Sequence, residues 1–158
     1  MYTFDASSII HAWENYPIEN FPRIWEWLST EIASGIFTIP KKAYDEVIRK
    51  FPECGEWLKS NDIERILLSP AMLQEAVRIK GLLGITDDNY GSGVGENDLL
   101  IIATAKISNA VLITEEAPQF ALPKMLSSYK IPAVCRLETV SVDAIPFIQV
   151  IKLLRPVF

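Results

Sequence analysis

The sequence predicts an α/β fold, a three-layer α/β/α sandwich built on a mainly parallel sheet. Short apolar runs with strand character alternate along the chain with longer segments of helical periodicity. The strand-like runs lack a regular polar and apolar alternation, which is typical of strands buried on both faces. Of the 158 residues, 49% are hydrophobic, so we expect one compact domain covering residues 1–158.

The N-terminal segment is expected to form a strand and two helices. Residues 2–4 are a very short apolar strand, and Asp5 with the serines after it can cap the following helix. Tyr16-Pro17 breaks that helix. Large apolar residues then recur at helical spacing over residues 21–35, where a proline lies near the start and a glycine at the end.

The middle of the chain predicts a strand, further helices and one ambiguous segment. Residues 36–39 favour a strand, and Pro40 opens a helix. Residues 53–59 predict another short helix. Residues 63–68 fit either a strand or the end of a helix, because a short apolar run has no decisive periodicity. Residues 71–83 predict a helix entered after a serine and a proline.

The C-terminal half begins with a glycine-rich loop at residues 84–95, which we expect to be mobile. A strongly apolar helix follows from Asn97, and residues 110–113 predict a buried strand. Three further elements complete the prediction: a helix at 118–127, a last core strand at 131–135 and a closing helix at 142–154.

The charge and composition exclude some classes of protein. The net charge of −5 is not typical of a general nucleic-acid binder, but it allows an enzyme whose acidic residues surround bound cations. No apolar run approaches the roughly 20 residues of a membrane span, and no signal peptide is recognisable, so we expect a cytoplasmic protein without membrane contact. Cys54 and Cys135 are expected to be reduced, buried thiols. The basic residues are expected to be solvated surface charges, namely Lys41, Lys42, Arg49, Lys50, Lys124, Lys130 and Arg136.

Acidic residues follow two of the predicted strands directly. Asp5 follows the first strand, and Glu115 and Glu116 follow residues 110–113 and Thr114. Sites in parallel sheets form outside the carboxyl ends of the strands, so these carboxylates are candidate ligands. Local structure offers an alternative for each, since Asp5 can cap a helix and the two glutamates can begin one.

Two further acids lie on predicted helices. Asp98 occupies the first turn of an otherwise almost entirely apolar helix and heads its inward face. Helix capping is the alternative, although Glu96 and Asn97 could supply it equally well. Glu46 lies at the edge of the apolar side of the helix that follows Pro40, where an isolated glutamate is usually a rim residue.

The chemistry that these residues offer is metal binding through oxygen. Carboxylates are ligands for Mg²⁺ or Mn²⁺, whereas the chain has no histidine and cysteine cluster for zinc. His11 is the single histidine and is expected to be a surface or core residue rather than a general base. The glycine-rich loop lacks the lysine of a phosphate-binding P-loop, and no nucleophile-elbow motif is present.

The motifs resemble those of the PIN domain, the nuclease fold of VapC-type toxins. That family has an apolar strand ending in Asp-x-Ser, a Glu on a later helix, an Asp opening an apolar helix, and Thr-x-acid after a strand. The counterparts here are Phe4-Asp5-Ala6-Ser7, Glu46, Asn97-Asp98 and Thr114-Glu115-Glu116. The chain is still more similar to a PIN-like prokaryotic family of unknown function, over Tyr16-Pro17, Phe21-Pro22 and residues 43–46, 56–58, 114–116 and 131–135.

The resemblance implies a metal-dependent endoribonuclease that hydrolyses single-stranded or structured RNA. It assigns one or two Mg²⁺ or Mn²⁺ ions to Asp5, Glu46, Asp98 and Glu116. It implies that Ser7 and Thr114 form hydrogen bonds with the ligands and that Glu115 lies beside them. The Thr-x-acid spacing favours Glu116 over Glu115 as the last ligand. It further implies the toxin of a type II toxin–antitoxin system, an antitoxin partner and a homodimer.

Two departures from the VapC pattern keep other functions open. The last acid is a glutamate rather than an aspartate, and a glycine-rich loop precedes Asp98. One alternative is a PIN-like module that has lost catalysis and works through protein partners. Residues 13–27 and 84–95 are candidate contact surfaces for the homodimer and the antitoxin that the resemblance implies. Another alternative is a metal hydrolase such as a phosphatase, which is disfavoured because Ser7 stands where haloacid-dehalogenase-like phosphatases have a second aspartate.

Overall fold

Five parallel strands form the sheet, in the order β3-β2-β1-β4-β5. The computed structural model describes residues 1–158, and the predicted α/β class with a parallel sheet is confirmed. The central strand β1 places Tyr2 opposite Phe37 of β2 on one side and opposite Val111 of β4 on the other. The strand bounds are β1 Tyr2–Phe4, β2 Phe37–Pro40, β3 Glu64–Ile66, β4 Val111–Ile113 and β5 Ala144–Ile145.

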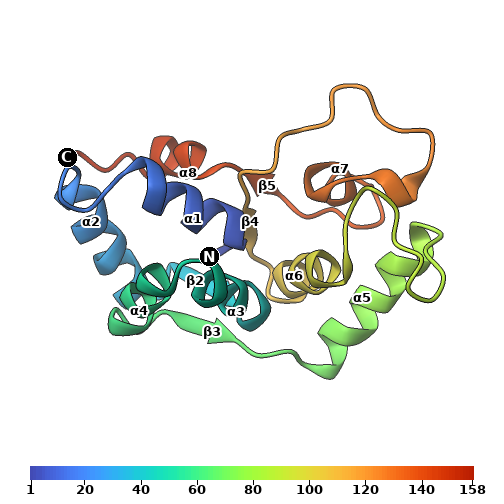
Figure 1. The fold of residues 1–158 in the computed structure, drawn as a ribbon, viewed down its shortest axis with the longest axis horizontal. Coiled ribbons are helices and arrows are strands. Elements are labelled where there is room, and N and C mark those ends of the chain that lie inside the picture. Colours follow the sequence, from blue (N-terminus) through green and yellow to red (C-terminus); the bar gives the residue numbers. More distant parts are fainter.

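Helices cover both faces of this sheet (Figure 1). All four residues of β2 are buried, and because successive strand residues point to opposite faces, both faces must be covered. None of the helices is long and apolar enough to span a membrane. The helices are α1 Ala6–Asn15, α2 Pro22–Ala33, α3 Lys41–Lys50, α4 Pro52–Ser60, α5 Pro70–Leu82, α6 Glu96–Ile107, the 3-10 helix η1 Leu126–Ser128, α7 Ile131–Cys135 and α8 Phe147–Leu154.

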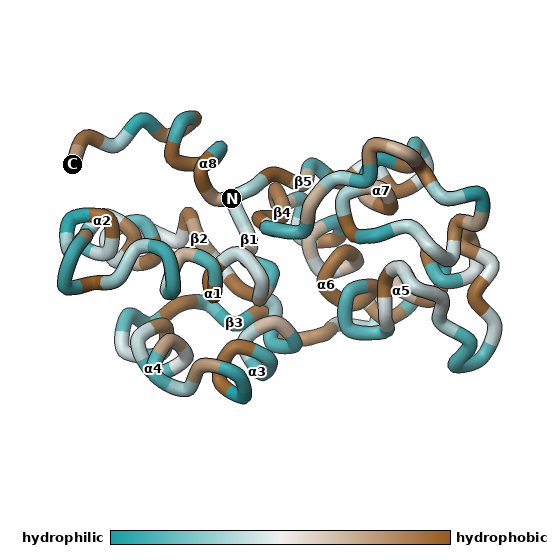
Figure 2. Tube along the Cα trace, turned by 45° about the horizontal axis from the view of Figure 1, so that its top comes forward, coloured by the Kyte–Doolittle hydropathy of each residue, from teal (hydrophilic) through white to brown (hydrophobic).

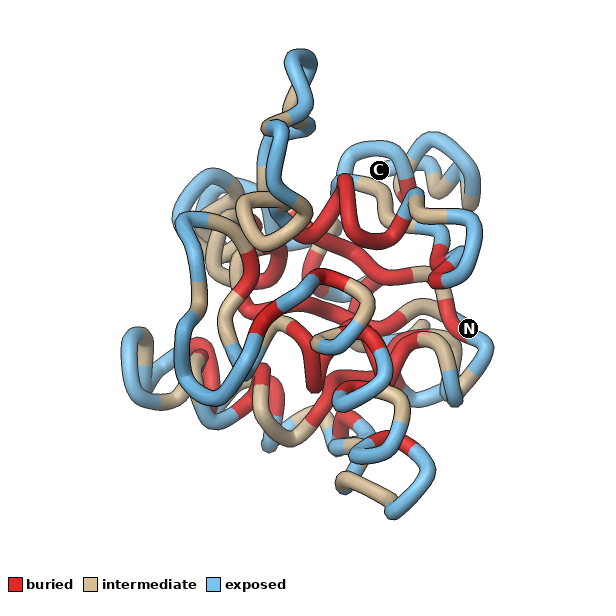
Figure 3. The backbone as a smooth tube through the Cα atoms, turned by 90° about the vertical axis from the view of Figure 1, so that its right-hand side faces the viewer, coloured by how far each residue is buried: buried red, intermediate tan, exposed pale blue.

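Helix α6 contributes a long buried segment to one side of the core. It lies between β4 and α5 and is mostly apolar (Figure 2), and its residues from Leu99 to Ala105 are all buried. Figure 3 shows the buried segments as a central body with the exposed segments around it. The apolar helix predicted from Asn97 is therefore present. Burial of the rest of the helix fixes the position of its first turn, which lies at the surface.

The tryptophans and cysteines belong largely to the interior. Trp25 is 3% exposed, and the rings of Trp13 and Trp57 pack edge-on against it with centroids 5.3 and 4.8 Å away. Trp25 is thus a core residue. The part of residues 13–27 that could contact a partner is therefore smaller than the sequence suggested. Cys54 and Cys135 are free and buried, as predicted, and burial raises the pKa of both thiols to about 12, so neither is a reactive thiolate.

Two predicted elements in the C-terminal third are wrong, and a third is confirmed only in part. Residues 131–135 form the short helix α7 rather than a core strand, with Pro132 in its first turn, where a missing amide is harmless. Residues 118–127 do not form the predicted helix. They form a loop that leads into η1, and Pro123 in this loop disfavours a helix. The closing helix is confirmed only at Phe147–Leu154, because Ala144–Ile145 pairs with β4 as the fifth strand.

The glycine-rich loop packs closely on the segment that precedes α7. The amide of Val94 donates to the carbonyl oxygen of Tyr129 at 2.9 Å, and the Val94 side chain is 1% exposed. A Cβ on Gly91 would lie 2.7 Å from the carbonyl oxygen of Ser127, and one on Gly93 would overlap the carbonyl of Tyr129. These glycines therefore permit close backbone contact, and the second half of the loop is held in place.

Replacing Gly93 by alanine is expected to lower the free energy of unfolding by about 1–3 kcal/mol, because the new methyl group forces two backbone segments apart. Gly81→Ala is the matched control. Gly81 is exposed near the end of α5 with nothing within 4 Å of an added Cβ, so alanine there is expected to stabilise the chain by up to about 1 kcal/mol. Urea denaturation measures both, and a Gly93→Ala midpoint equal to the wild type would contradict the loop packing described.

Candidate metal-binding site

Five acidic residues from four parts of the chain line one open cavity. The cavity has a volume of about 220 Å³ and lies beyond the carboxyl ends of β1 and β4. All four predicted ligands face it, together with two of the three residues expected beside them; Thr114 is buried next to it. The lining residues are Asp5, Ser7, Glu46, Asp98, Glu115, Glu116 and Ile131.

Asp5 is fixed by two hydroxyl groups that donate to one of its oxygens. The Ser7 hydroxyl donates to Oδ2 at 2.6 Å, and the buried Thr114 hydroxyl donates to the same atom at 3.0 Å. Each hydroxyl in turn accepts a backbone amide, Ser7 from Glu115 at 3.1 Å and Thr114 from Glu116 at 3.2 Å. These links join the end of β1 to the end of β4 and orient both hydroxyls toward Asp5.

This network shows that the Asp5 side chain does not cap helix α1. The residue does occupy the position before the first turn of α1, with extended backbone angles, but its side chain makes no capping hydrogen bond. Its carboxylate is instead 5% exposed and directed to the network with Ser7 and Thr114. The polar cluster at the end of the central strand is therefore built around Asp5.

Asp98 and Glu46 reach the cavity from two helices in contact, α6 and α3. Oδ2 of Asp98 accepts the amide of Gly95 at 2.8 Å, so Asp98 caps α6 as well as lining the cavity. Glu46 forms an ion pair with Lys50 one turn later on α3, and its side chain is 24% exposed. The carboxylate of Asp98 thus has a fixed position, whereas that of Glu46 is held only by a surface lysine.

The two glutamates after β4 each accept the amide of the first residue of a helix. Oε1 of Glu115 accepts the amide of Phe147 at the start of α8, at 2.8 Å. Oε2 of Glu116 accepts the amide of Ile131 at the start of α7, also at 2.8 Å. Carboxylates are stabilised at helix N-termini. The Ile131 amide was missed by sequence analysis, because residues 131–135 were assigned to a strand.

The carboxylates in the cavity are close enough to affect one another. Burial raises the pKa of Asp5, and the charge of Asp98 raises it further against the Ser7 and Thr114 hydrogen bonds. Burial and then Glu46 raise the pKa of Asp98, despite the Gly95 hydrogen bond. Burial raises the pKa of Glu116, and Asp98 and Asp5 add to the effect. The charge of Glu116 is therefore coupled to the charges of the two aspartates.

The donor chemistry of the site fits a hard divalent cation. Its side chains are carboxylates and hydroxyls, without sulfur or imidazole, which suits Mg²⁺ or Mn²⁺. In the conformation described, no three acidic, histidine or cysteine side chains converge on a single ion position. Local partners hold two of the carboxylates, since Lys50 pairs with Glu46 and the Ile131 amide donates to Glu116.

His11 stands apart from the acidic cavity. Its ring packs edge-on against Tyr16 with centroids 6.5 Å apart, and its Nδ1 atom is buried without a hydrogen-bond partner. The residue does not line the cavity. The ring of His11 is thus part of the packing around α1, away from the carboxylates.

Comparisons with known proteins find a matching family and similar solved structures. The crystal structure of VapBC2 from Rickettsia felis bound to a DNA fragment from its promoter is similar over 82% of this chain and 96% of the other, with 19% sequence identity and a TM-score of 0.48. No curated protein sequence matches the chain. The family described as "Domain of unknown function (DUF4411)" matches residues 2–157, and the chain therefore belongs to this family.

Proposed function

We propose that the chain is a metal-dependent endoribonuclease that hydrolyses RNA phosphodiesters. The observation that carries the proposal is one cavity in which burial raises the pKa of Asp5, Asp98 and Glu116, and in which the charge of a neighbouring carboxylate raises each of these pKa values further. Such crowding of like charges opposes folding, and strongly perturbed groups gather at functional sites. An acidic, open cavity suits a divalent cation and, through that cation, an anionic substrate.

Each residue of the cavity has a role in this proposal. The carboxylates of Asp5, Glu46, Asp98 and Glu116 would hold Mg²⁺ or Mn²⁺. A bound cation supplies positive charge to the phosphoryl group and acidifies a water molecule. Ser7 and Thr114 hold Asp5 in position by donating to one oxygen, and Glu115 ties β4 to α8. The open form of the cavity suits a single-stranded or looped backbone.

The fold family and the biological role are part of the same proposal. The four carboxylates stand at the positions that the PIN resemblance assigns to metal ligands, and we infer a PIN-like domain on this basis. We extend the inference to the toxin of a type II toxin–antitoxin system, with an antitoxin protein and a second copy of the chain as partners.

A second candidate function is a protein-binding module without catalysis. It is favoured by one observation, that no three ligating side chains converge on an ion position in the conformation described. The two candidates differ in metal affinity. A nuclease needs a cation in the acidic cavity, whereas a binding module does not.

Calorimetric titration with Mn²⁺ tests the proposed function. We expect the wild type to bind Mn²⁺ and Asp98→Asn to lose most of that binding, because asparagine removes a charge while its carbonyl can still accept the Gly95 amide. Glu96→Gln is the matched control, since Glu96 lies in the same turn of α6 but is exposed and outside the acidic cavity. We expect it to bind as the wild type does.

The result separates the two candidates. Binding that is lost in Asp98→Asn and kept in Glu96→Gln would support the carboxylate metal site. A wild-type chain that binds no Mn²⁺ would exclude the metal-dependent nuclease and leave the protein-binding module.

A further inference from the structure

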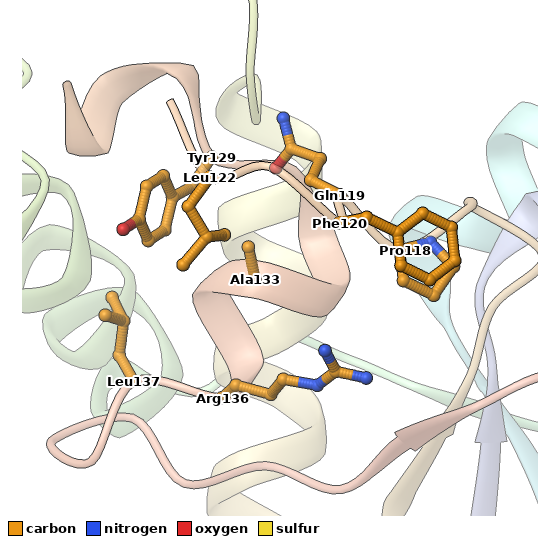
Figure 4. Close-up of a pocket in the computed structure, with 8 residues that line it drawn as sticks. All are labelled: Pro118, Gln119, Phe120, Leu122, Tyr129, Ala133, Arg136 and Leu137. Atoms are coloured by element: carbon orange, nitrogen blue, oxygen red, sulfur yellow. The ribbon is translucent and has the colours of Figure 1, made fainter. Parts of the chain in front are cut away.

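A second and larger cavity lies on the other side of helix α7. Its volume is about 400 Å³, and its walls come from the loop after β4, from Tyr129 and from α7 itself (Figure 4). The aromatic and apolar part of the wall is formed by Pro118, Phe120, Leu122 and Tyr129, with Ala133 of α7 behind them. Arg136 provides the single charged side chain of the wall.

The loop that forms this cavity presents apolar side chains to water. Phe120 is 99% exposed, Leu122 58% and Met125 68%. Figure 1 shows the loop projecting beyond the rest of the fold before it returns to α7, and the same exposed loop rises from the top of Figure 3. Exposed aromatic groups on a projecting loop indicate a binding surface.

The loop is nevertheless anchored at the point where Phe120 emerges. The Gln119 amide group donates to the carbonyl oxygen of Ser128 at 3.2 Å, and its oxygen accepts the amide of Lys130 at 2.8 Å. The Tyr129 backbone is held in turn by the amide of Val94. Phe120 and Tyr129 are therefore attached to neighbouring, cross-linked backbone segments on either side of the cavity.

The charge of this segment is opposite to that of the chain. Residues 117–137 contain Lys124, Lys130 and Arg136 and no aspartate or glutamate, whereas the whole chain carries a net charge of −5. All three cations are exposed. A basic segment with exposed aromatic side chains is complementary to an anionic partner that carries planar rings, which is the chemistry of single-stranded nucleic acid.

The two cavities share their dividing wall. Ile131, the first residue of α7, lines the acidic cavity, while Ala133 of the same helix and Arg136, directly after it, line the larger one. Glu116 and Pro118 are two residues apart, so their Cα atoms are separated by at most about 7 Å. A strand with one phosphate at the carboxylates can therefore place a neighbouring base in the larger cavity.

We propose that the cavity around Phe120, Tyr129 and Arg136 is a base-stacking subsite for single-stranded RNA. The inference rests on the proposed function and adds to it the binding place for a nucleotide next to the scissile phosphate. The rings of Phe120 and Tyr129 stack on a base, and Arg136 meets the backbone or the face of the base. Base stacking tolerates any sequence, so this subsite selects unpaired RNA rather than a particular base.

Fluorescence anisotropy with a labelled single-stranded RNA, in EDTA and at low salt, tests the subsite apart from catalysis. Phe120→Ala is expected to weaken binding by about 5-fold or more. Arg136→Ala is expected to weaken binding and to reduce the salt dependence by about one phosphate contact. The controls are Val157→Ala, at a residue that is 96% exposed, and Arg23→Ala on α2; both should bind as the wild type.

Equal RNA binding by the wild type and Phe120→Ala would overturn the subsite, and RNA hydrolysis with Mn²⁺ would then still support the proposed function. Binding that depends on Phe120 in a chain without hydrolysis would support the subsite and count against the nuclease. A wild-type chain that binds no RNA would overturn the subsite.

Discussion

Metal-dependent RNA hydrolysis by Asp98→Asn is expected to be at least about 100-fold slower than by the wild type. Asp98 stands at the centre of the acidic cavity, since its charge raises the pKa of both Asp5 and Glu116. Under the proposed function, removing this charge takes away one of the four carboxylate ligands of the metal. Initial rates on a labelled RNA in Mn²⁺ measure the loss, and a near wild-type rate would remove Asp98 from the chemistry.

Helix α3 provides a closely matched pair of variants for the same experiment. Asp45 and Glu46 are adjacent, and each forms an ion pair with a lysine one turn away on the helix surface, Lys41 and Lys50 respectively. Only Glu46 lines the acidic cavity. We expect Glu46→Gln to lower the rate by about 10-fold or more and Asp45→Asn to leave it unchanged. Equal rates for the two variants would show that Glu46 is a rim residue.

Asp98→Asn is also expected to melt at a higher temperature than the wild type when metal is absent and the pH is near neutral. Burial raises the pKa of the Asp98 carboxyl above its ordinary value of 3.8, and the charge of Glu46 adds to this effect. The folded state therefore holds the proton more tightly than the unfolded state does. It follows that ionisation of Asp98 destabilises the fold, and asparagine avoids that destabilisation.

The direction of the pKa shift also fixes how this difference depends on pH. Below the ordinary value of 3.8 the carboxyl is protonated and uncharged in both the folded and the unfolded state, so it does not affect the free energy of unfolding. As the pH rises through the raised pKa of the folded state, the wild type loses stability relative to the variant, and above that pKa the full difference is present. Thermal unfolding in EDTA from about pH 4 to about pH 8 measures it.

The controls for this experiment separate the site from general electrostatics. Glu96→Gln removes an exposed charge in the same helical turn and should show no such pH-dependent advantage. Mn²⁺ should raise the melting temperature of the wild type and leave that of Asp98→Asn unchanged, because only a bound ligand stabilises the folded state. A difference between wild type and Asp98→Asn that stays constant over the pH range would contradict the raised pKa of Asp98.

The sequence predicted most of the sheet and helices because their signals are local. Helices α2, α3 and α5 carry large apolar residues at helical spacing and begin at or next to a proline. Residues 131–135 have no such signal, since five apolar residues fit a buried helix as well as a buried strand. The strand Ala144–Ile145 is two residues long, too short for any periodicity, and depends on pairing with β4.

The residues of the acidic cavity were predictable, but their connections were not. Position at a strand end or in a first helical turn singled out Asp5 and Asp98 from their neighbours. The choice between Glu115 and Glu116 depends on contacts with Phe147 and Ile131, at the starts of α8 and α7. Those contacts lie 32 and 15 residues away along the chain, and no local pattern in the sequence contains them.

The place of β1 in the middle of the sheet affects when the site can form during synthesis. Asp5 leaves the ribosome before Thr114, which holds it and lies 109 residues later. At elongation rates of about 5–20 residues per second, the two segments emerge roughly 5–20 s apart. A nascent chain therefore exposes an incomplete sheet and no assembled carboxylate cluster until the segment around Thr114 has emerged. The acidic cavity thus forms seconds after its first carboxylate has been synthesised.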